Sequence, residues 1–107
     1  MKLTGKQKSF LKSKAHHLKP IFQIGKNGLN DELIKQIGEA VEKRELIKIN
    51  LLQNTAEEIT DAANVIEEAI GGQVIQIIGR VIVLFKKSTQ EKYHRISLEI
   101  PNNKNEN

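Results

Sequence analysis

The chain of 107 residues has no cysteine and no tryptophan, and it has only one tyrosine and three phenylalanines. Without cysteine, disulfides, thiolate zinc sites and cysteine nucleophiles are excluded, which suits a reducing compartment. Phe10, Phe22 and Phe85 fall in apolar patterns and are expected in the core, which leaves Tyr93 as the one other aromatic residue. A sheet that displays several aromatic rings for stacking on bases is therefore not expected.

Long hydrophobic runs are also missing. The longest apolar run is VIVLF at residues 81–85, which is far too short to cross a membrane, and the basic N-terminus never enters an apolar region. We therefore expect a cytoplasmic protein with no membrane association. The length suits one domain with a single core, expected over residues 1–101, and the final NNKNEN (102–107) reads as a disordered tail.

The positive charge is concentrated at one end. Residues 1–26 contain seven lysines and no acid, whereas residues 27–107 contain ten Lys/Arg against thirteen Asp/Glu, and the two parts together give the net +4. A segregated basic segment is typical of a surface that binds a polyanion. A solvated lysine-rich helix is the alternative.

That basic segment is predicted to form a helix from Thr4 to Leu18, because its apolar residues fall on one arc at about 100° per residue. Thr4 is a suitable N-cap. On the same helical wheel, Lys8, Lys12 and Lys19 cluster beside the apolar arc, while Lys6 lies on the opposite flank. The helix is thus expected to carry a basic stripe.

Further elements follow from periodicity and capping. They are a strand at 20–25, a helix at 30–46, a strand at 46–52, a helix at 55–72 with a Thr55/Glu58 capping box, and two strands within 73–88 joined by a type II′ turn at Gly79-Arg80. The order α-β-α-β-α-β-β predicts an α/β two-layer sandwich with a mixed four-stranded sheet and three helices. Right-handed crossovers place the second and third helices on one face. Alternation of Ile96, Leu98 and Ile100 could add a further strand.

The stretch IGKNGLN (24–30) connects the first strand to the second helix. Free N–H groups before a helix favour an anion, although a tight turn would use the same two glycines. Asp31 and Glu32 would repel a phosphate placed on the helix axis. We therefore expect the contact to be made by the amides of residues 26–28 and by the Lys26 ammonium group.

Other candidate sites are weaker. His16 and His17 point about 100° apart on a helix and have no cysteine nearby, so no metal site is expected. Arg80 could be a solvated turn residue or a phosphate anchor, and Lys86-Lys87 could extend a basic surface or protect a strand edge. The acidic residues of the third helix are expected to form a solvated face: Glu57, Glu58, Asp61, Glu67 and Glu68. No pattern indicates a catalytic group.

The basic first helix followed by IGKNGL, ELIKINLL, IIGRVIVLFKK and ISLEIP, in this order, resembles the CRM-domain family, specifically stand-alone bacterial YhbY-like proteins. The resemblance implies an RNA-binding domain, associated in bacteria with precursors of the large ribosomal subunit and in plants with intron splicing. Its fold is similar to the C-terminal domain of translation initiation factor three. The loop is likened to the GxxG loop of KH domains, although here it joins a strand to a helix.

Together, the residues and the resemblance predict a non-enzymatic, monomeric protein that contacts structured ribosomal RNA during large-subunit assembly, with no cofactor, metal or small-molecule substrate. The alternatives are a protein-interaction module whose basic helix meets an acidic ribosome-associated partner and, third, an enzyme that acts on RNA. The expected RNA-binding residues are Gly25, Lys26, Asn27, Gly28, Lys6, Lys8, Lys12, Lys19, Arg80, Lys86 and Lys87.

Overall fold

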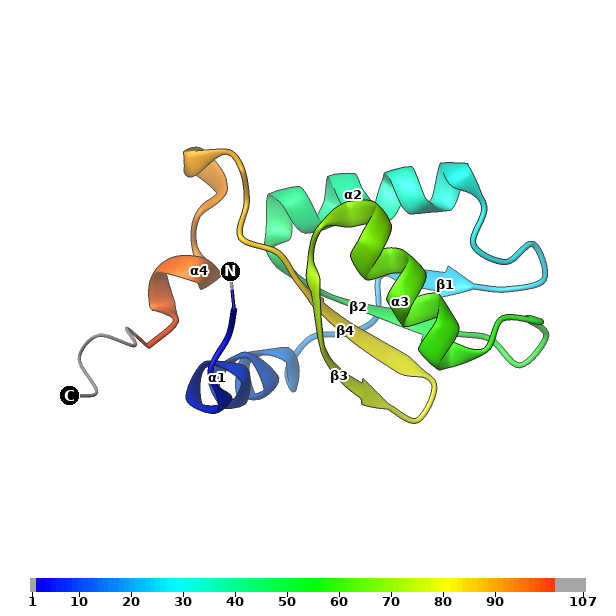
Figure 1. Cartoon of the computed structure of the whole chain (residues 1–107), viewed down its shortest axis with the longest axis horizontal. Coiled ribbons are helices and arrows are strands. Elements are labelled where there is room, and N and C mark those ends of the chain that lie inside the picture. Colours follow the sequence, from blue (N-terminus) through cyan, green and yellow to red (C-terminus); the bar gives the residue numbers. More distant parts are fainter. Residues whose placement is uncertain (1, 102–107) are drawn as a thin grey trace.

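The computed structural model describes residues 2–101, in which a four-stranded sheet is flanked by helices (Figure 1). The elements are α1 (Gly5–Ala15), β1 (Phe22–Ile24), α2 (Asp31–Arg44), β2 (Leu46–Leu51), α3 (Ile59–Ile70), β3 (Gln73–Ile78), β4 (Val81–Phe85), the 3₁₀ turn η1 (Glu91–Tyr93) and α4 (Ile96–Glu99). The predicted order of helices and strands up to β4 is confirmed.

The sheet is mixed, as predicted, with the strand order β1-β2-β4-β3. β1 runs parallel to β2, and β4 pairs antiparallel with both β2 and β3. Gly79, at the β3–β4 turn, has a φ of +56°, as the first turn residue of a type II′ hairpin requires. The short strand β1 is one edge of the sheet. It leads directly into the IGKNGLN stretch, whose residues 25–28 are called the glycine loop below.

α2 and α3 cover one face of the sheet, as the crossover rule predicts. The period-2 pattern of β2 sends Ile47, Ile49 and Leu51 to this face, where they meet Ile37 of α2 and Ile66 of α3. All five are at most 2% exposed. This cluster is the main core, and it fixes α2, whose N-terminus follows the glycine loop.

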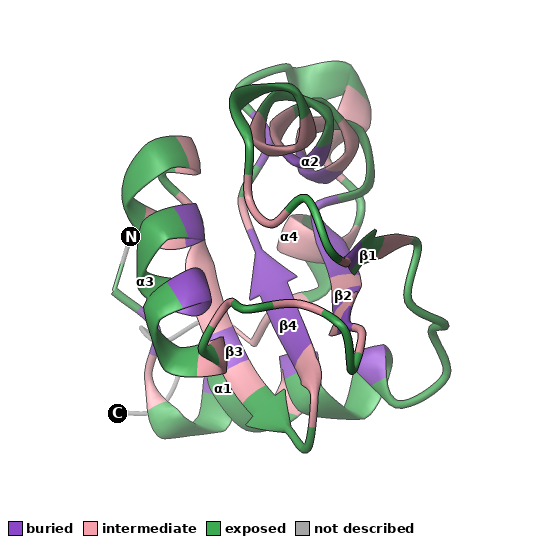
Figure 2. Cartoon of the chain, turned by 90° about the vertical axis from the view of Figure 1, so that its right-hand side faces the viewer, coloured by how far each residue is buried: buried purple, intermediate pink, exposed green. Residues whose placement is uncertain are grey.

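The opposite face of the sheet is covered by α1, so the sandwich has three layers where two were predicted. Leu11 and Ala15 of α1 pack with Leu46, Val83 and Phe85 in a second apolar cluster. Strand β4 is therefore buried between α1 and the other helices (Figure 2). The continuous apolar run of β4 is typical of a strand covered on both faces, and it was the sequence signal for this third layer.

Two helix boundaries differ from the prediction. α1 begins at the predicted N-cap, Thr4, which forms a capping box with Gln7, but it ends at Ala15 and not at Leu18. α3 is capped by Glu58, whose carboxylate accepts from the amides of Thr60 and Asp61, so the predicted Thr55/Glu58 box is wrong. Thr55 instead accepts a hydrogen bond from the amide of Glu57 through its hydroxyl oxygen.

Up to residue 101, the segment after β4 forms no fifth strand. Residues Ile96–Glu99 form the short helix α4, and Ile96 and Ile100, four positions apart, pack together on the α1 cluster. Leu98 lies on the other side and is 73% exposed. Apolar residues at 96, 98 and 100 fit the period of 2 of a strand, and the pair at 96 and 100 also fits the period of 3.6 of a helix. Packing against α1 selects the helix. The predicted tail, 102–107, lies outside the described residues.

Candidate functional site

The glycine loop is a tight turn with its own internal hydrogen bond. The Gly28 amide donates to the Gly25 carbonyl oxygen at 3.0 Å, and Gly28 has a φ of +66°. This left-handed conformation favours glycine. Of the three amides expected to meet an anion, that of Gly28 is therefore already used within the turn.

Glu57, in the segment before α3, holds the glycine loop in place. Its carboxylate accepts from the Leu29 amide at 2.8 Å, and a Cβ on Gly28 would lie 2.5 Å from its Oε2 atom. The predicted assignment of Glu57 to a solvated acidic face is therefore wrong: it is a positioning residue for the loop. Gly28 is required both for its backbone conformation and for this close approach.

The outer side of the turn presents unused donors. Within residues 2–101 the amides of Lys26 and Asn27 have no hydrogen-bond partner, and both side chains are exposed. At the N-terminus of α2, by contrast, the Leu33 amide donates to the Asn30 side chain at 2.8 Å, and Asp31 and Glu32 add two negative charges in the first turn. The turn therefore offers two free amides and one ammonium group to an anion, whereas the acidic first turn of α2 disfavours one.

The β3–β4 hairpin is tied to the same end of the sheet through Arg80. Its guanidinium group donates through Nε to the Leu51 carbonyl at 2.9 Å and through Nη2 to the Leu52 carbonyl at 2.8 Å. The Leu52 amide in turn donates to the Ile24 carbonyl, one residue before the glycine loop. Arg80 therefore holds the end of β2 beside the loop, and this uses two of the five N–H donors of its guanidinium group.

The lysines of the N-terminal segment are only partly arranged as predicted. Lys8 and Lys12 are exposed on α1, four positions apart and thus on one flank. Lys19 is exposed as well, but it lies beyond the end of the helix, in the segment that leads to edge strand β1. Lys6, also exposed, lies in the first turn of α1. The basic surface thus extends from α1 toward β1 and is not confined to one helical stripe.

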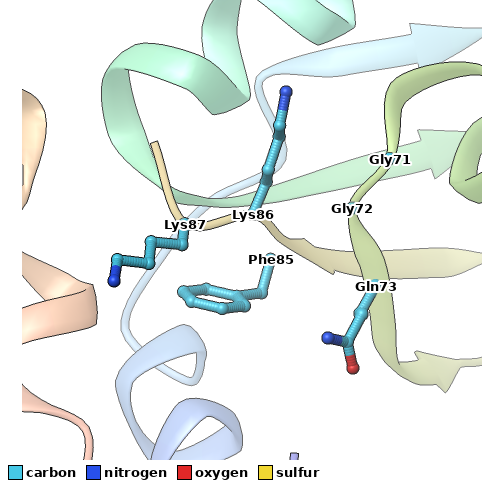
Figure 3. A pocket seen from close by; sticks show the side chains of 6 residues that line it. All are labelled: Gly71, Gly72, Gln73, Phe85, Lys86 and Lys87. Carbon is cyan, nitrogen blue, oxygen red and sulfur yellow. The ribbon is translucent and has the colours of Figure 1, made fainter. Parts of the chain in front are cut away.

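Adjacent Lys86 and Lys87 point in different directions, as Figure 3 shows at the hollow formed with Gly72 and Phe85. Lys86 forms an ion pair of 3.0 Å with Glu42 of α2. Burial raises the pKa of Glu42, but hydrogen bonds from Thr89, Lys86 and Ser88 outweigh it and lower this pKa to about 2. Lys86 is therefore paired within the fold, whereas Lys87 is exposed.

Sequence reasoning missed two basic features near α1. Lys48 of β2 donates from Nζ to the Leu18 carbonyl at 3.0 Å, which places a cation beneath the end of α1. Around Leu18 lies a separate hollow, the Tyr93 hollow, which combines four basic residues with one ring: it is lined by Leu18, Lys43, Arg44, Leu46, Lys92, Tyr93, Arg95 and Ile96. Only the Lys43-Arg44 pair was visible as a local sequence signal.

Among residues 2–101 no group of three or more His, Asp or Glu side chains is placed to hold a metal ion. No helix in that part of the chain is both long and apolar enough to span a membrane.

Comparison with known proteins gives a consistent result. The model of the CRS1/YhbY (CRM) domain matches residues 3–86. Probable RNA-binding protein YqeI of Bacillus subtilis is 54% identical over 99 residues, covering 92% of this chain and 99% of that protein. An RNA-binding protein of Haemophilus influenzae is 36% identical over 90 residues, covering 84% of this chain and 91% of its own length.

A solved structure agrees with the fold. The solution structure of protein SAV1595 from Staphylococcus aureus superposes with a TM-score of 0.72 at 44% identity, covering 94% of this chain and 98% of that one. The match thus covers nearly the full length of both chains. The similarity therefore extends over the whole arrangement and is not limited to one motif.

Proposed function

The chain belongs to the CRS1/YhbY (CRM) domain family, and from this premise we propose that it binds RNA through the glycine loop and the lysines around α1. The observation that carries the proposal is the outward-facing side of the turn, where the amides of Lys26 and Asn27 are unpaired within residues 2–101 and the Lys26 side chain is exposed. Such a turn contacts the sugar-phosphate backbone and does not read base edges.

The charge distribution supports the same mode of binding. The seven lysines of residues 1–26 have no acid among them, and Lys8, Lys12 and Lys19 are exposed. Each phosphate that a lysine neutralises releases counterions, so affinity should fall steeply as salt increases. Arg80 contributes by positioning the loop, and Lys87 supplies a further exposed cation.

We further propose that the RNA is structured ribosomal RNA and that the protein, as a monomer in the cytoplasm, assists assembly of the large subunit by binding and not by catalysis. The few exposed rings favour recognition by shape and phosphate position, which suits folded RNA. Residues 2–101 would act as one domain, since the helices on both faces pack on the same sheet.

The test is a salt titration of binding to folded large-subunit ribosomal RNA with the intact protein and a Lys26→Asp/Asn27→Asp variant, which keeps both glycines. We expect the variant to bind at least about tenfold more weakly and to show a smaller salt slope, because one phosphate contact is lost and two negative charges are introduced. Circular dichroism checks that both proteins fold.

A matched control separates the local effect from net charge. Lys35→Asp/Asn64→Asp makes the same charge change at exposed positions of α2 and α3, away from the loop. Equal weakening by the two variants would remove the loop from the interface. If the intact protein does not bind ribosomal RNA at all, or binds with no salt dependence, the proposed function is wrong.

A further inference from the structure

The Tyr93 hollow lies where the C-terminal end of α2 meets the segment that follows β4. Arg44 is the last residue of α2, and Lys92 and Tyr93 belong to η1. The apolar floor is formed by Leu46, which is 3% exposed, and by the half-buried Ile96. Tyr93, the only tyrosine in a chain without tryptophan, borders this floor.

The four basic residues of the hollow are not neutralised within the fold. Lys43, Arg44, Lys92 and Arg95 are all exposed, and none forms an ion pair within residues 2–101. No acidic residue lines the hollow. The Lys92 ammonium group lies 5.1 Å from the centroid of the Tyr93 ring, so this exposed lysine covers one face of the ring, and a base that stacks there would displace it. This concentration of positive charge favours an anionic ligand.

The position of the hollow is fixed by a buried acid. Glu45, which is fully buried, accepts hydrogen bonds through its carboxylate from the amides of Arg95 and Ser97 at 2.9 and 3.0 Å. The segment that carries Tyr93 and Arg95 is therefore held in place against the end of α2. A surface built in this way is preorganised.

We propose that the Tyr93 hollow binds one unpaired nucleotide of RNA, with its base against the Tyr93 ring and its flanking phosphates at Arg44 and Arg95. This inference rests on the proposed RNA-binding function and adds a second contact to it. Tyr93 and Arg95 lie beyond residues 3–86, the part matched by the family model, so the match does not assign them a role. The hollow encloses about 260 Å³, which suits a small planar group better than a folded segment.

The chemistry favours a nucleotide over an acidic peptide. A carboxylate-rich peptide would satisfy the cations but would leave the half-buried Tyr93 ring and the apolar floor without a matching group. A nucleotide supplies both a flat apolar face for stacking and phosphates for guanidinium groups, and stacking on an aromatic ring tolerates any base. Arginine can also stack on a base through its guanidinium plane.

The chain allows a direct measurement, because Tyr93 is its only tyrosine and there is no tryptophan. Intrinsic fluorescence therefore reports on this hollow alone. The intact protein is titrated with single-stranded hexauridylate, and the same additions to N-acetyltyrosinamide correct for light absorbed by the RNA. We expect the fluorescence to fall by about half or more at saturation. A hexamer with abasic riboses keeps the phosphates but lacks the bases, and we expect it to leave the fluorescence nearly unchanged.

Two pairs of variants make the assignment specific. Tyr93→Leu should weaken hexauridylate binding at least about fivefold, whereas Tyr93→Phe should stay within about twofold of the intact protein. Arg44→Gln should weaken binding and lower the salt slope, whereas Lys35→Gln, also exposed on α2, should change neither. Circular dichroism confirms the fold of each variant.

The outcomes separate this inference from the function on which it rests. If ribosomal RNA binds with a steep salt dependence but neither ribosomal RNA nor hexauridylate changes the Tyr93 fluorescence, the hollow is not a nucleotide site and the RNA-binding proposal stands. If no RNA binds, both are wrong. If poly-glutamate quenches Tyr93 as strongly as hexauridylate does, the hollow recognises acidic protein and the nucleotide assignment is overturned.

Discussion

The Glu45 carboxylate accepts a hydrogen bond from the Ser97 hydroxyl at 2.7 Å, across 52 positions of sequence. The same carboxylate also accepts from the Ser88 amide at 2.8 Å. Glu45 is fully buried and adopts a left-handed conformation with a φ of 66°, which is unusual for a residue with a side chain. One acidic side chain thus joins the end of α2 to the C-terminal segment and replaces the ion pair that a buried charge would otherwise need.

Replacing Glu45 by glutamine should destabilise the protein by about 2–4 kcal/mol, because one acceptor oxygen becomes an NH₂ group that faces N–H donors. Denaturant unfolding measures the loss. Hydrogen exchange should show faster exchange than the global loss explains for the Ser88 amide or for the Arg95 and Ser97 amides, because Ser88 donates to one carboxylate oxygen and the other two to the second, and glutamine keeps only one oxygen. Uniform acceleration over the whole chain would contradict a local role.

Stability should fall in mild acid. The pKa of Glu42 is lowered from 4.5 to about 2, and that of Glu45 is also lowered, since hydrogen bonds outweigh the opposing effect of burial. A group with a depressed pKa in the folded state stabilises the fold above its unfolded value, near 4.5, and loses this contribution as pH falls toward 2. For Glu42 this shift corresponds to about 3 kcal/mol, and Glu45 contributes in the same direction. Chemical unfolding from pH 7 to pH 3 tests this, and Glu42→Gln should flatten the profile.

The two glycines of the loop should respond differently to alanine. At Gly28 the added Cβ meets a positive φ and the Glu57 carboxylate, so Gly28→Ala should cost about 1–2 kcal/mol and weaken RNA binding. At Gly25 the nearest atom would be the Leu52 Cδ1 at 3.3 Å, which a small side-chain shift relieves. Gly25→Ala should therefore stay within about 1 kcal/mol of the parent in thermal unfolding. Equal losses would show that the turn conformation is not the deciding factor.

Arg80 should act mainly through stability. Arg80→Gln cannot reproduce the two bonds to the Leu51 and Leu52 carbonyls, so we expect a loss of about 1–2 kcal/mol. RNA affinity should fall, with an almost unchanged salt slope, if the loop is displaced and no phosphate contact is lost. A slope reduced by about one would instead place Arg80 in direct contact with phosphate.

The lysines of α1 should affect RNA binding and not stability. Lys8→Gln/Lys12→Gln removes two exposed charges from one flank of the helix without touching the core, so stability should change by less than about 0.5 kcal/mol. The salt slope for ribosomal RNA should fall by up to about two. An unchanged slope, measured beside thermal unfolding of the same variant, would remove α1 from the interface.

The sequence predicted the elements well where periodicity and capping agree. Asn30, the acidic first turn of α2 and the alternation of β2 all point to the same structure, and the mixed sheet followed from the element order. The second face of the sheet was missed because α1 has only a few apolar residues. Its burial partner, β4, carried the signal as an unbroken apolar run.

The site was harder to predict because its side chains are used through long-range contacts. Glu57, Arg80 and Lys86 look like ordinary surface charges in sequence, yet each bonds to a group 28, 28–29 or 44 positions away along the chain. The Tyr93 hollow joins the end of α2 to a segment about 50 residues later through Glu45. No local pattern identifies which acid will fill such a role, because the choice depends on the packed fold.

α2 sets a fixed distance between the glycine loop and the Tyr93 hollow. It is an unbroken helix of 14 residues, and at 1.5 Å per residue its ends are about 21 Å apart. The glycine loop lies before its first turn and the Tyr93 hollow after its last, and a helix packed along its length on a sheet does not stretch. An RNA engaged at both ends must present a backbone phosphate and an unpaired base at about that separation. Selection among RNAs would then depend on spacing, with the helix serving as a ruler.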